Sequence, residues 1–298
     1  MNIGIETGYL EGYWGNWPWV PMYGGSEHIV VELAKEFAAL GHQVTVRLPR
    51  DQDERIWNNV HWVSHSSAPA RYDLLLSFDS YELRDKGDRT VLVACRSDAP
   101  VHTQFDRMVF LSRHHARLMG HPDSPAIGGG VRLSDYEHSL KRVPGRIIAT
   151  SSPDRCRAIF DIGQNYPGFI ATYRPVRGLP ETKELTREDL VGLQKTAKAL
   201  IYPLDPVRPS DFYSMAVLEC LAAGTPVIVS DADAMPELWA DATVMLKRPI
   251  RLAEWVETID NLLQHKSYWN RMSVAGKKKA KDFDWPVVAQ RYLAIAME

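Results

Sequence analysis

The chain has 298 residues, which is enough for two domains of modest size. Its hydrophobic fraction of 45% and its charged fraction of 24% are ordinary for a globular protein. The formal net charge of −2 provides no overall attraction to nucleic acid, so a nucleic-acid partner is not expected. No run of about 18 apolar residues occurs, so we expect no membrane-spanning helix.

The three cysteines are scattered and include no Cys-x-x-Cys pair, which argues against a disulfide framework. The N-terminus begins with a strand-like segment and not with a basic and then apolar signal segment. Both features favour a cytoplasmic location.

Predicted strands and helices alternate along most of the chain, which indicates a parallel α/β architecture. In the first half, a stripe of apolar side chains predicts a helix over 26–40, with Ser26 as its N-cap and Gly41 just after its end. A short helix is expected over 112–119, and the three glycines at 128–130 are expected to form a hinge. Apolar runs predict strands at 2–6, 43–48, 74–78, 91–94 and 108–111.

A second alternating set begins near Arg146. One predicted helix, at 186–195, has a good N-terminal signal, because Thr186 can cap it and Asp189 follows three residues later. Other helices are expected from Pro153, from about 252 and 267, and over 285–296. Strands are predicted at 146–150, 169–172, 200–202, 226–230 and 243–246.

The most informative segment is 211–230, where Asp211 and Glu219 bracket a turn and the start of an apolar helix. Residues eight apart do not share a helix face, so we expect Asp211 in the loop and Glu219 about two turns along. The first backbone N–H groups of this helix would suit a phosphate. They belong to Ser214, Met215 and Ala216.

A glycine pair, Gly24 and Gly25, lies between the first predicted strand and the first predicted helix. Glycines permit a close approach of the backbone to a ligand and allow positive φ, and the helix N-terminus offers N–H donors to an anion. The alternative interpretation is an ordinary glycine-rich connection.

Aromatic residues are concentrated in the loop at 9–23, which contains six of them. Their rings can stack on sugars and bases, and amphipathic rings also suit a membrane interface. The alternative is that several rings simply pack on the domain. We expect this loop to contact a ligand through Tyr13, Trp14, Trp17, Trp19 and Tyr23.

The segment 211–219 resembles the E-x7-E motif of retaining glycosyltransferases with the GT-B fold, with Asp211 in place of the first glutamate. Segment 24–46 resembles the opening of glycosyltransferase family 4, the group 1 glycosyltransferases, with its glycine pair, Leu-Ala helix and Gly-His turn. The resemblance implies two Rossmann-like domains that face each other across a cleft. These are an acceptor-side domain at 1–135, a trimmed nucleotide-sugar-binding domain at 136–280, and a terminal helix at 281–298 that crosses back to the first domain.

The resemblance also implies roles for single residues. The ligand of the aromatic loop at 9–23, in the acceptor-side domain, would be the acceptor. Asp211 would face the transferred sugar, and Glu219 would accept hydrogen bonds from the ribose of the nucleotide. Segment 151–155 resembles the phosphate-binding loop of the family, in which Arg155 would hold the diphosphate. Asp98 matches the second member of a His-Asp pair in relatives, although it could also cap the next segment. The implied catalytic residues are Asp98, Arg155 and Asp211, and the implied donor-binding residues are Gly24, Gly25, Ser151, Arg155, Tyr213, Ser214, Met215, Ala216 and Glu219.

The implied reaction is retaining transfer of a sugar from a nucleotide-diphosphate sugar to a hydroxyl acceptor, which is a sugar, a lipid-linked molecule or another alcohol. It needs no cofactor and no metal, since Arg155 and the helix dipole would offset the phosphate charge. The adjacent His114 and His115 point in different directions on a helix and are not expected to bind a metal. A lysine run at 277–281 leaves peripheral membrane contact open.

Two alternative functions remain at this point. The aspartate at 211, together with Ser97 where relatives have the histidine before Asp98, is compatible with a sugar-nucleotide or glycan-binding protein that has lost catalysis. A glycosyltransferase acting on modified DNA is the other, because an aromatic loop could hold an extruded base. The near-neutral charge weighs against the DNA enzyme. The sequence determines neither the donor sugar, nor its base, nor the oligomeric state.

Overall fold

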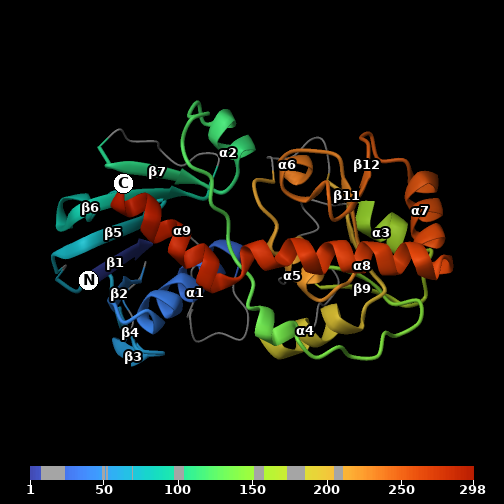
Figure 1. Ribbon diagram of the computed structural model, residues 1–298, viewed down its shortest axis with the longest axis horizontal. Helices are drawn as coiled ribbons and strands as arrows, with labels where there is room; N and C mark the ends of the chain where they lie inside the picture. The colour runs from blue at the N-terminus through green and yellow to red at the C-terminus, as the bar shows by residue number, and fades with distance from the viewer. Residues whose placement is uncertain are drawn as a thin grey trace. The chain divides into compact units, whose positions relative to one another are not determined.

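The computed structural model describes residues 1–7, 24–48, 51, 53–68, 70–96, 104–150, 158–172, 185–204 and 211–298. The chain divides into two compact units (Figure 1). The first contains residues 1–130 and 285–298, and the second contains residues 131–284. Within the described residues each unit is built on one mainly parallel sheet, so the α/β architecture predicted from the sequence is confirmed.

The sheet of the first unit has the strand order β3-β4-β2-β1-β5-β6-β7 in the described residues. The central strand β1 pairs in parallel with β2 on one side and with β5 on the other. The order of strands therefore reverses between β1 and β5, and ligands usually bind at such a switch point in α/β sheets. The strands are β1 (Asn2–Thr7), β2 (Gln43–Arg47), β3 (Arg55–Trp57), β4 (Val60–Val63), β5 (Tyr72–Phe78), β6 (Gly87–Ala94) and β7 (Arg107–Phe110).

Sequence analysis did not predict β3 and β4, which form an antiparallel hairpin at the edge of this sheet. The two residues between them, Asn58 and Asn59, have φ angles of 51° and 59°. Two consecutive positive φ angles are typical of the tight type I′ turn that joins two strands, and asparagine tolerates this conformation. The Asn-Asn pair could thus have indicated a hairpin turn, but the strands on either side are too short to be recognised as strands from the sequence.

The helices of the first unit are α1 (Gly25–Ala39), α2 (Arg113–Leu118), the 3-10 turn η1 (Arg84–Lys86) and α9 (Trp285–Met297). The prediction that Ser26 caps α1 is wrong. Helix α1 begins earlier, and its N-cap is Gly24, which has extended backbone angles and makes no side-chain cap. The C-terminal prediction is confirmed, because Gly41 has a φ of +85° just after the helix.

Helix α9 closes the first unit although it comes last in the sequence. Trp285 at its start is fully buried and lies against the ring of His28 in α1. Further along, the Tyr292 hydroxyl donates to the carbonyl of Ile127 at 3.0 Å, and Arg89 donates to the carbonyl of Ala296 at 3.1 Å. Truncating a buried tryptophan typically costs about 3–5 kcal/mol, so this helix is an integral part of the unit.

The second unit has the strand order β12-β11-β10-β8-β9 in the part of the chain that is described, and the strand order reverses between β8 and β10. The capping box predicted for α4 is present, with Thr186 and Asp189 each bonded to the backbone of the other. The strands are β8 (Ile147–Ala149), β9 (Phe169–Ala171), β10 (Ala199–Tyr202), β11 (Val227–Ser230) and β12 (Val244–Leu246). The helices are α3 (Ala158–Gly163), α4 (Arg187–Thr196), α5 (Met215–Ala222), α6 (Met235–Trp239), α7 (Leu252–Gln264) and α8 (Lys266–Ala280), with 3-10 turns η2 (Leu133–Tyr136) and η3 (Lys281–Phe283).

A partly buried arginine, Arg142, fixes the ends of α4 and α5. The guanidinium of Arg142 donates to the carbonyls of Gln194 at 3.1 Å and Ala197 at 2.9 Å, at the end of α4. It also donates to the carbonyl of Ala223 at the end of α5, at 2.6 Å. These carbonyls have no partner within their helices, so Arg142 satisfies them and locks the two helices together.

Candidate functional site

Asp211 lies at the carboxyl end of the second sheet, in the segment before α5 as predicted, and it is only 2% exposed. Its carboxylate accepts a hydrogen bond from the hydroxyl of Tyr202, the last residue of β10. Its backbone N–H donates to the carboxylate of Asp233 at 3.1 Å, and its carbonyl accepts from the N–H of Ala234 at 3.2 Å. Both the side chain and the backbone of Asp211 are therefore held in place.

The N-terminus of α5 follows directly. Ser214 is the N-cap, and its hydroxyl oxygen accepts from the N–H of Val217 at 3.2 Å. The N–H of Leu218 donates to the Ser214 carbonyl at 3.2 Å. Helix geometry leaves the N–H groups of Met215 and Ala216 without an acceptor inside α5, and both residues are partly exposed. The sequence predicts a phosphate-binding site at this helix end, at the N–H groups of Ser214, Met215 and Ala216, and the positive end of the helix dipole would favour an anion there. Anion binding here stays a prediction.

Tyr213, also expected near the donor, is a mostly buried residue at this end of α5. Its ring lies 5.6 Å from the ring of Trp239 in α6, in an edge-to-face arrangement, and 6.4 Å from that of Phe283. The aromatic cluster gives the segment before α5 a rigid support.

Glu219 lies in the second turn of α5 and is 5% exposed. Arg187, the first residue of α4, contacts its Oε1 at 2.5 Å, and the amide of Gln194 donates to its Oε2 at 2.7 Å. Burial would lower the pKa of Arg187, but the nearby Glu219 and Tyr136 oppose this and raise it above its usual value. The carboxylate thus lies in a fixed and charge-compensated setting.

Sequence reasoning missed Arg187, Gln194 and Tyr202. No local sequence motif marks any of the three. Each was missed because its contact in the site is with a side chain that folding brings close. The capping signal at Thr186 placed Arg187 at the start of a helix, but no local pattern indicates that this helix lies beside α5.

The glycine pair marks the start of α1, although not through an unusual backbone. Gly24 has a φ of −71°, so the freedom to adopt positive φ is not used there, and its carbonyl accepts from the backbone N–H of His28 at 2.9 Å.

Several other residues predicted for the site lie outside the described residues. These are Asp98, Ser151 and Arg155 of the implied catalytic and donor sets, and Tyr13, Trp14, Trp17, Trp19 and Tyr23 of the acceptor loop.

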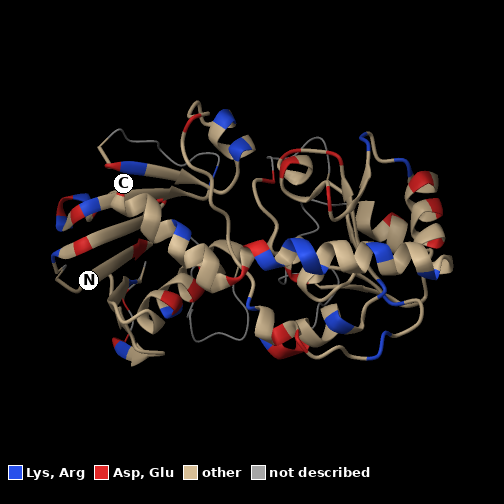
Figure 2. Ribbon diagram, viewed as in Figure 1, with Lys and Arg blue, Asp and Glu red and all other residues tan. Residues whose placement is uncertain are grey.

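The lysine run lies near the end of α8, where Figure 2 shows that part of the helix ribbon in blue. Lys277 and Lys278 are exposed, whereas Lys279 forms an ion pair with Asp241 at 3.0 Å. Peripheral membrane contact stays a prediction. No helix in the described ranges is both long and apolar enough to cross a membrane.

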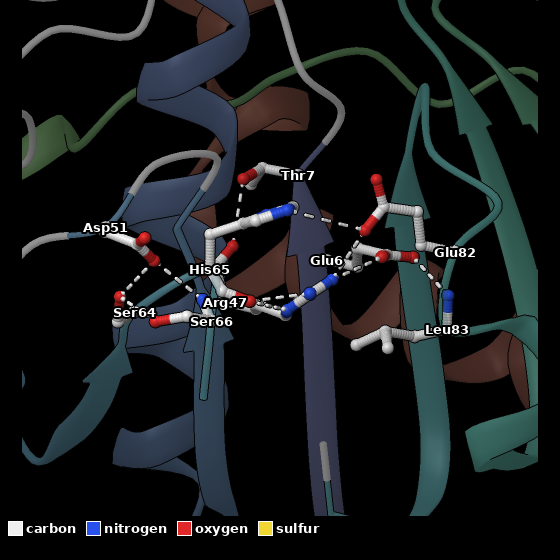
Figure 3. A network of polar contacts seen from close by, with 9 residues as sticks. All are labelled: Glu6, Thr7, Arg47, Asp51, Ser64, His65, Ser66, Glu82 and Leu83. Atoms are coloured by element: carbon white, nitrogen blue, oxygen red, sulfur yellow. Dashed lines mark hydrogen bonds and ion pairs between the residues drawn. The ribbon is translucent and has the colours of Figure 1, made fainter. Parts of the chain in front are cut away.

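A polar cluster in the first unit was not predicted (Figure 3). Glu6 is 1% exposed, and its pairing register sets it beside Arg47 of β2 and Ser77 of β5, at the switch point of the sheet. Arg47 contacts the carboxylates of Glu6 at 3.3 Å and of Glu82 at 2.9 Å. Ser77 and the N–H of Leu83 each donate to Glu6 at 3.2 Å. Burial raises the pKa of Glu6, and the bonds from its neighbours only partly oppose the rise.

Of the two adjacent histidines, His115 lies in the interior of the first unit. His115 is fully buried, its Nε2 lies 3.2 Å from the carbonyl of Arg96, and burial lowers its pKa to about 4. It is therefore a neutral packing residue against the ring of Phe110. Among the described residues, no three His, Cys, Asp or Glu side chains come together in a way that could hold a metal ion.

Residues 182–279 match the family model described as "Glycosyl transferases group 1". The matched segment contains α4, α5 and the acids of the candidate site. This segment, about a third of the chain, is therefore similar to the group 1 glycosyltransferases. No curated protein sequence matches the chain.

Solved structures similar to this protein cover nearly the whole chain. AviGT4, a glycosyltransferase involved in avilamycin A biosynthesis, is 14% identical with a TM-score of 0.72, over 99% of this chain and 97% of that one. HepE of Anabaena, in complex with UDP and glucose, is 12% identical with a TM-score of 0.71, over 100% of both chains. WaaG, a glycosyltransferase involved in lipopolysaccharide biosynthesis, is 12% identical with a TM-score of 0.65, over 99% of both. At these identities the likeness establishes the fold, which is that of the GT-B glycosyltransferases.

Proposed function

We propose that this protein is a retaining glycosyltransferase that moves a sugar from a nucleotide-diphosphate sugar to a hydroxyl acceptor. One observation carries the proposal: Asp211, the N-terminus of α5 and Glu219 follow one another at the carboxyl end of a parallel sheet, inside the segment that matches the family. An acid, a row of backbone N–H groups and a second acid suit a sugar, a diphosphate and a ribose in that order.

In this proposal the diphosphate binds at the N–H groups of Met215 and Ala216. As the bond between the sugar and the phosphate breaks, negative charge develops on the leaving diphosphate. The helix dipole and these preorganised donors stabilise that charge, and Arg155 adds a bidentate cationic contact. No metal is required for this purpose.

Glu219 accepts hydrogen bonds from the ribose hydroxyls, and Asp211 faces the sugar. The acceptor oxygen attacks the anomeric carbon from the face that the diphosphate leaves, and a leaving-phosphate oxygen takes the proton of the acceptor hydroxyl. The configuration at the anomeric carbon is then retained. The aromatic loop of the first unit, with Trp17 and Trp19, holds the acceptor. The proposed compartment is the cytoplasm, where the buried thiols of Cys95 and Cys220 stay reduced.

A panel of nucleotide-sugars tests the proposal by thermal shift and by donor hydrolysis. A donor present at 100 times its dissociation constant stabilises the folded state by about 2.7 kcal/mol, which raises the melting temperature by several degrees. The anomeric configuration of the transfer product, read by NMR, distinguishes retention from inversion. If no nucleotide-sugar or nucleoside diphosphate shifts the melting temperature, the donor site is assigned wrongly.

One observation favours a binding protein without catalysis as the second candidate. Aspartate is one methylene shorter than the glutamate of the family motif, and the carboxylate of Asp211 is buried and bonded to Tyr202. Such an acid is poorly placed to reach a sugar. A protein of this kind would bind a donor without turning it over, and Asp211→Glu would then create or increase turnover. If wild type transfers sugar and Asp211→Glu does not improve it, this second candidate is excluded.

A further inference from the structure

Glu219 and three other side chains form a closed ring of hydrogen bonds. The Tyr136 hydroxyl, in η2, donates to Oε1 of Gln194 at 2.6 Å. The Gln194 amide donates to Oε2 of Glu219 at 2.7 Å, and Arg187 contacts Oε1 of Glu219 at 2.5 Å. A longer contact of 3.5 Å, from Arg187 to the Tyr136 hydroxyl, closes the ring.

On both sides of the ring, donation begins at Arg187 and ends at the Glu219 carboxylate. Because the Tyr136 hydroxyl donates to the carbonyl of Gln194, the NH2 group of that amide must face Glu219. Each carboxylate oxygen of Glu219 therefore receives one hydrogen bond from inside the unit. An ionised carboxylate has about four lone-pair sites, so both oxygens keep the capacity to accept another donor each. Two adjacent ribose hydroxyls supply two such donors.

Neither charge nor helix packing requires the side chain of Gln194. Arg187 already compensates the charge of Glu219, and the amide adds no charge of its own. Arg142 already joins the ends of α4 and α5 through the backbone carbonyls of Gln194 and Ala223. The fully buried Gln194 amide thus contributes orientation, which is what a carboxylate needs if it is to meet two hydroxyls at once.

We propose that Gln194, oriented by Tyr136 and assisted by Arg187, is the positioning residue that sets the Glu219 carboxylate to bind the ribose of a nucleoside diphosphate. This inference rests on the proposed function. It assigns the role to an uncharged side chain that touches Glu219 and not the nucleotide.

The variant Gln194→Glu tests it, since it keeps the shape of the side chain and replaces the NH2 group by an oxygen. Two carboxylates at this separation must share a proton, and mutual repulsion raises the pKa of the pair. Below that pKa one carboxyl group of the pair is protonated, and its O–H replaces the N–H donor of the amide. Above that pKa both carboxylates are charged and repel each other, so the Glu219 side chain moves out of its position.

The other groups that face the pair hold their charge between pH 5.5 and 8. Burial raises the pKa of both Tyr136 and Cys220, so they stay neutral, while the raised pKa of Arg187 keeps it charged. Asp135 also lies near Arg187. A pH dependence of the variant in this range therefore reports the engineered carboxylate pair.

The measured quantity is the dissociation constant of the nucleoside diphosphate, by calorimetry, for the variant relative to wild type at the same pH. The probe is whichever of UDP, GDP, ADP, CDP or dTDP raises the melting temperature of wild type most. Taking the ratio cancels the titration of the nucleotide itself. We expect a ratio near 1 at pH 5.5 and about 10 or more at pH 8. Gln264→Glu, the same change on the exposed end of α7, is the matched control and should give a ratio near 1 at both values.

The outcomes separate clearly. If wild type binds none of the five nucleotides, the proposed function fails and this inference falls with it. If wild type binds one of them and the ratio stays near 1 at pH 8 while the melting temperature falls, the ring is only structural and the inference is overturned. Should Gln194→Glu unfold at pH 8, Tyr136→Phe replaces it, because losing the hydroxyl releases the orientation of the amide. We expect about 2- to 10-fold weaker binding at both pH values, and unchanged affinity overturns the inference.

Discussion

Removing the Tyr202 hydroxyl is the most direct test of the proposed role of Asp211. The variant Tyr202→Phe deletes one oxygen from a side chain that is 3% exposed, and it leaves the Asp211 carboxylate without its bond from β10. Contacts to Asp233 and Ala234 still hold the Asp211 backbone, so the loop stays in place. What changes is the orientation of one carboxylate.

The expected magnitude follows from the type of bond. A hydrogen bond to a charged group is worth about 1.5–3 kcal/mol, and if Asp211 faces the sugar this loss appears in the transition state. We expect kcat/KM for sugar transfer to fall about 10- to 150-fold, with little change in donor affinity. Steady-state kinetics with the donor identified by the panel, together with calorimetry, measure both quantities.

A second Tyr–Asp pair in the same unit provides the matched control. The Tyr166 hydroxyl donates to Asp260 at 3.1 Å and to the carbonyl of Val256 at 3.0 Å, away from α5. Tyr166→Phe therefore makes the same chemical change and should lower the melting temperature without lowering kcat/KM. The reasoning is refuted if Tyr202→Phe keeps the wild-type rate, or if both variants lose the same fraction of activity.

Four further predictions concern the donor, the metal, the acceptor and the first unit. Glu219→Ala should weaken donor binding about 10- to 150-fold while the protein stays folded, and unchanged affinity by calorimetry would remove its ribose role. Turnover should survive EDTA; a complete loss that manganese restores would show that the phosphate site needs a metal. Replacing both Trp17 and Trp19 by alanine should raise the acceptor KM and spare donor affinity, and the opposite pattern would assign the loop to the donor. Burial raises the pKa of Glu6, so its contribution to stability is present below its usual pKa of about 4.5 and is lost as pH rises through the higher folded value. Glu6→Gln should therefore make the denaturation midpoint depend less on pH above pH 4.5. An unchanged pH dependence would contradict the raised pKa.

Much of the local structure follows from the sequence alone, because it depends on neighbours in the chain. The capping box at Thr186 and Asp189 uses residues three apart, and the helix end at Gly41 needs only a glycine that accepts positive φ. The placement of Asp211 in a loop and Glu219 inside a helix follows from helix geometry. These features form wherever the same short segment is placed.

The partners of the site residues were decided by the tertiary structure. Glu219 meets Arg187 and Gln194 because α4 lies against α5, and Glu6 meets Arg47 because β1 and β2 pair in one particular register. A stretch of sequence specifies a strand or a helix through the spacing of its apolar residues. The register and packing of elements dozens of residues apart depend instead on burying their apolar faces together. The sequence by itself therefore located the acids of the site, and only folding determined which side chains hold them in position.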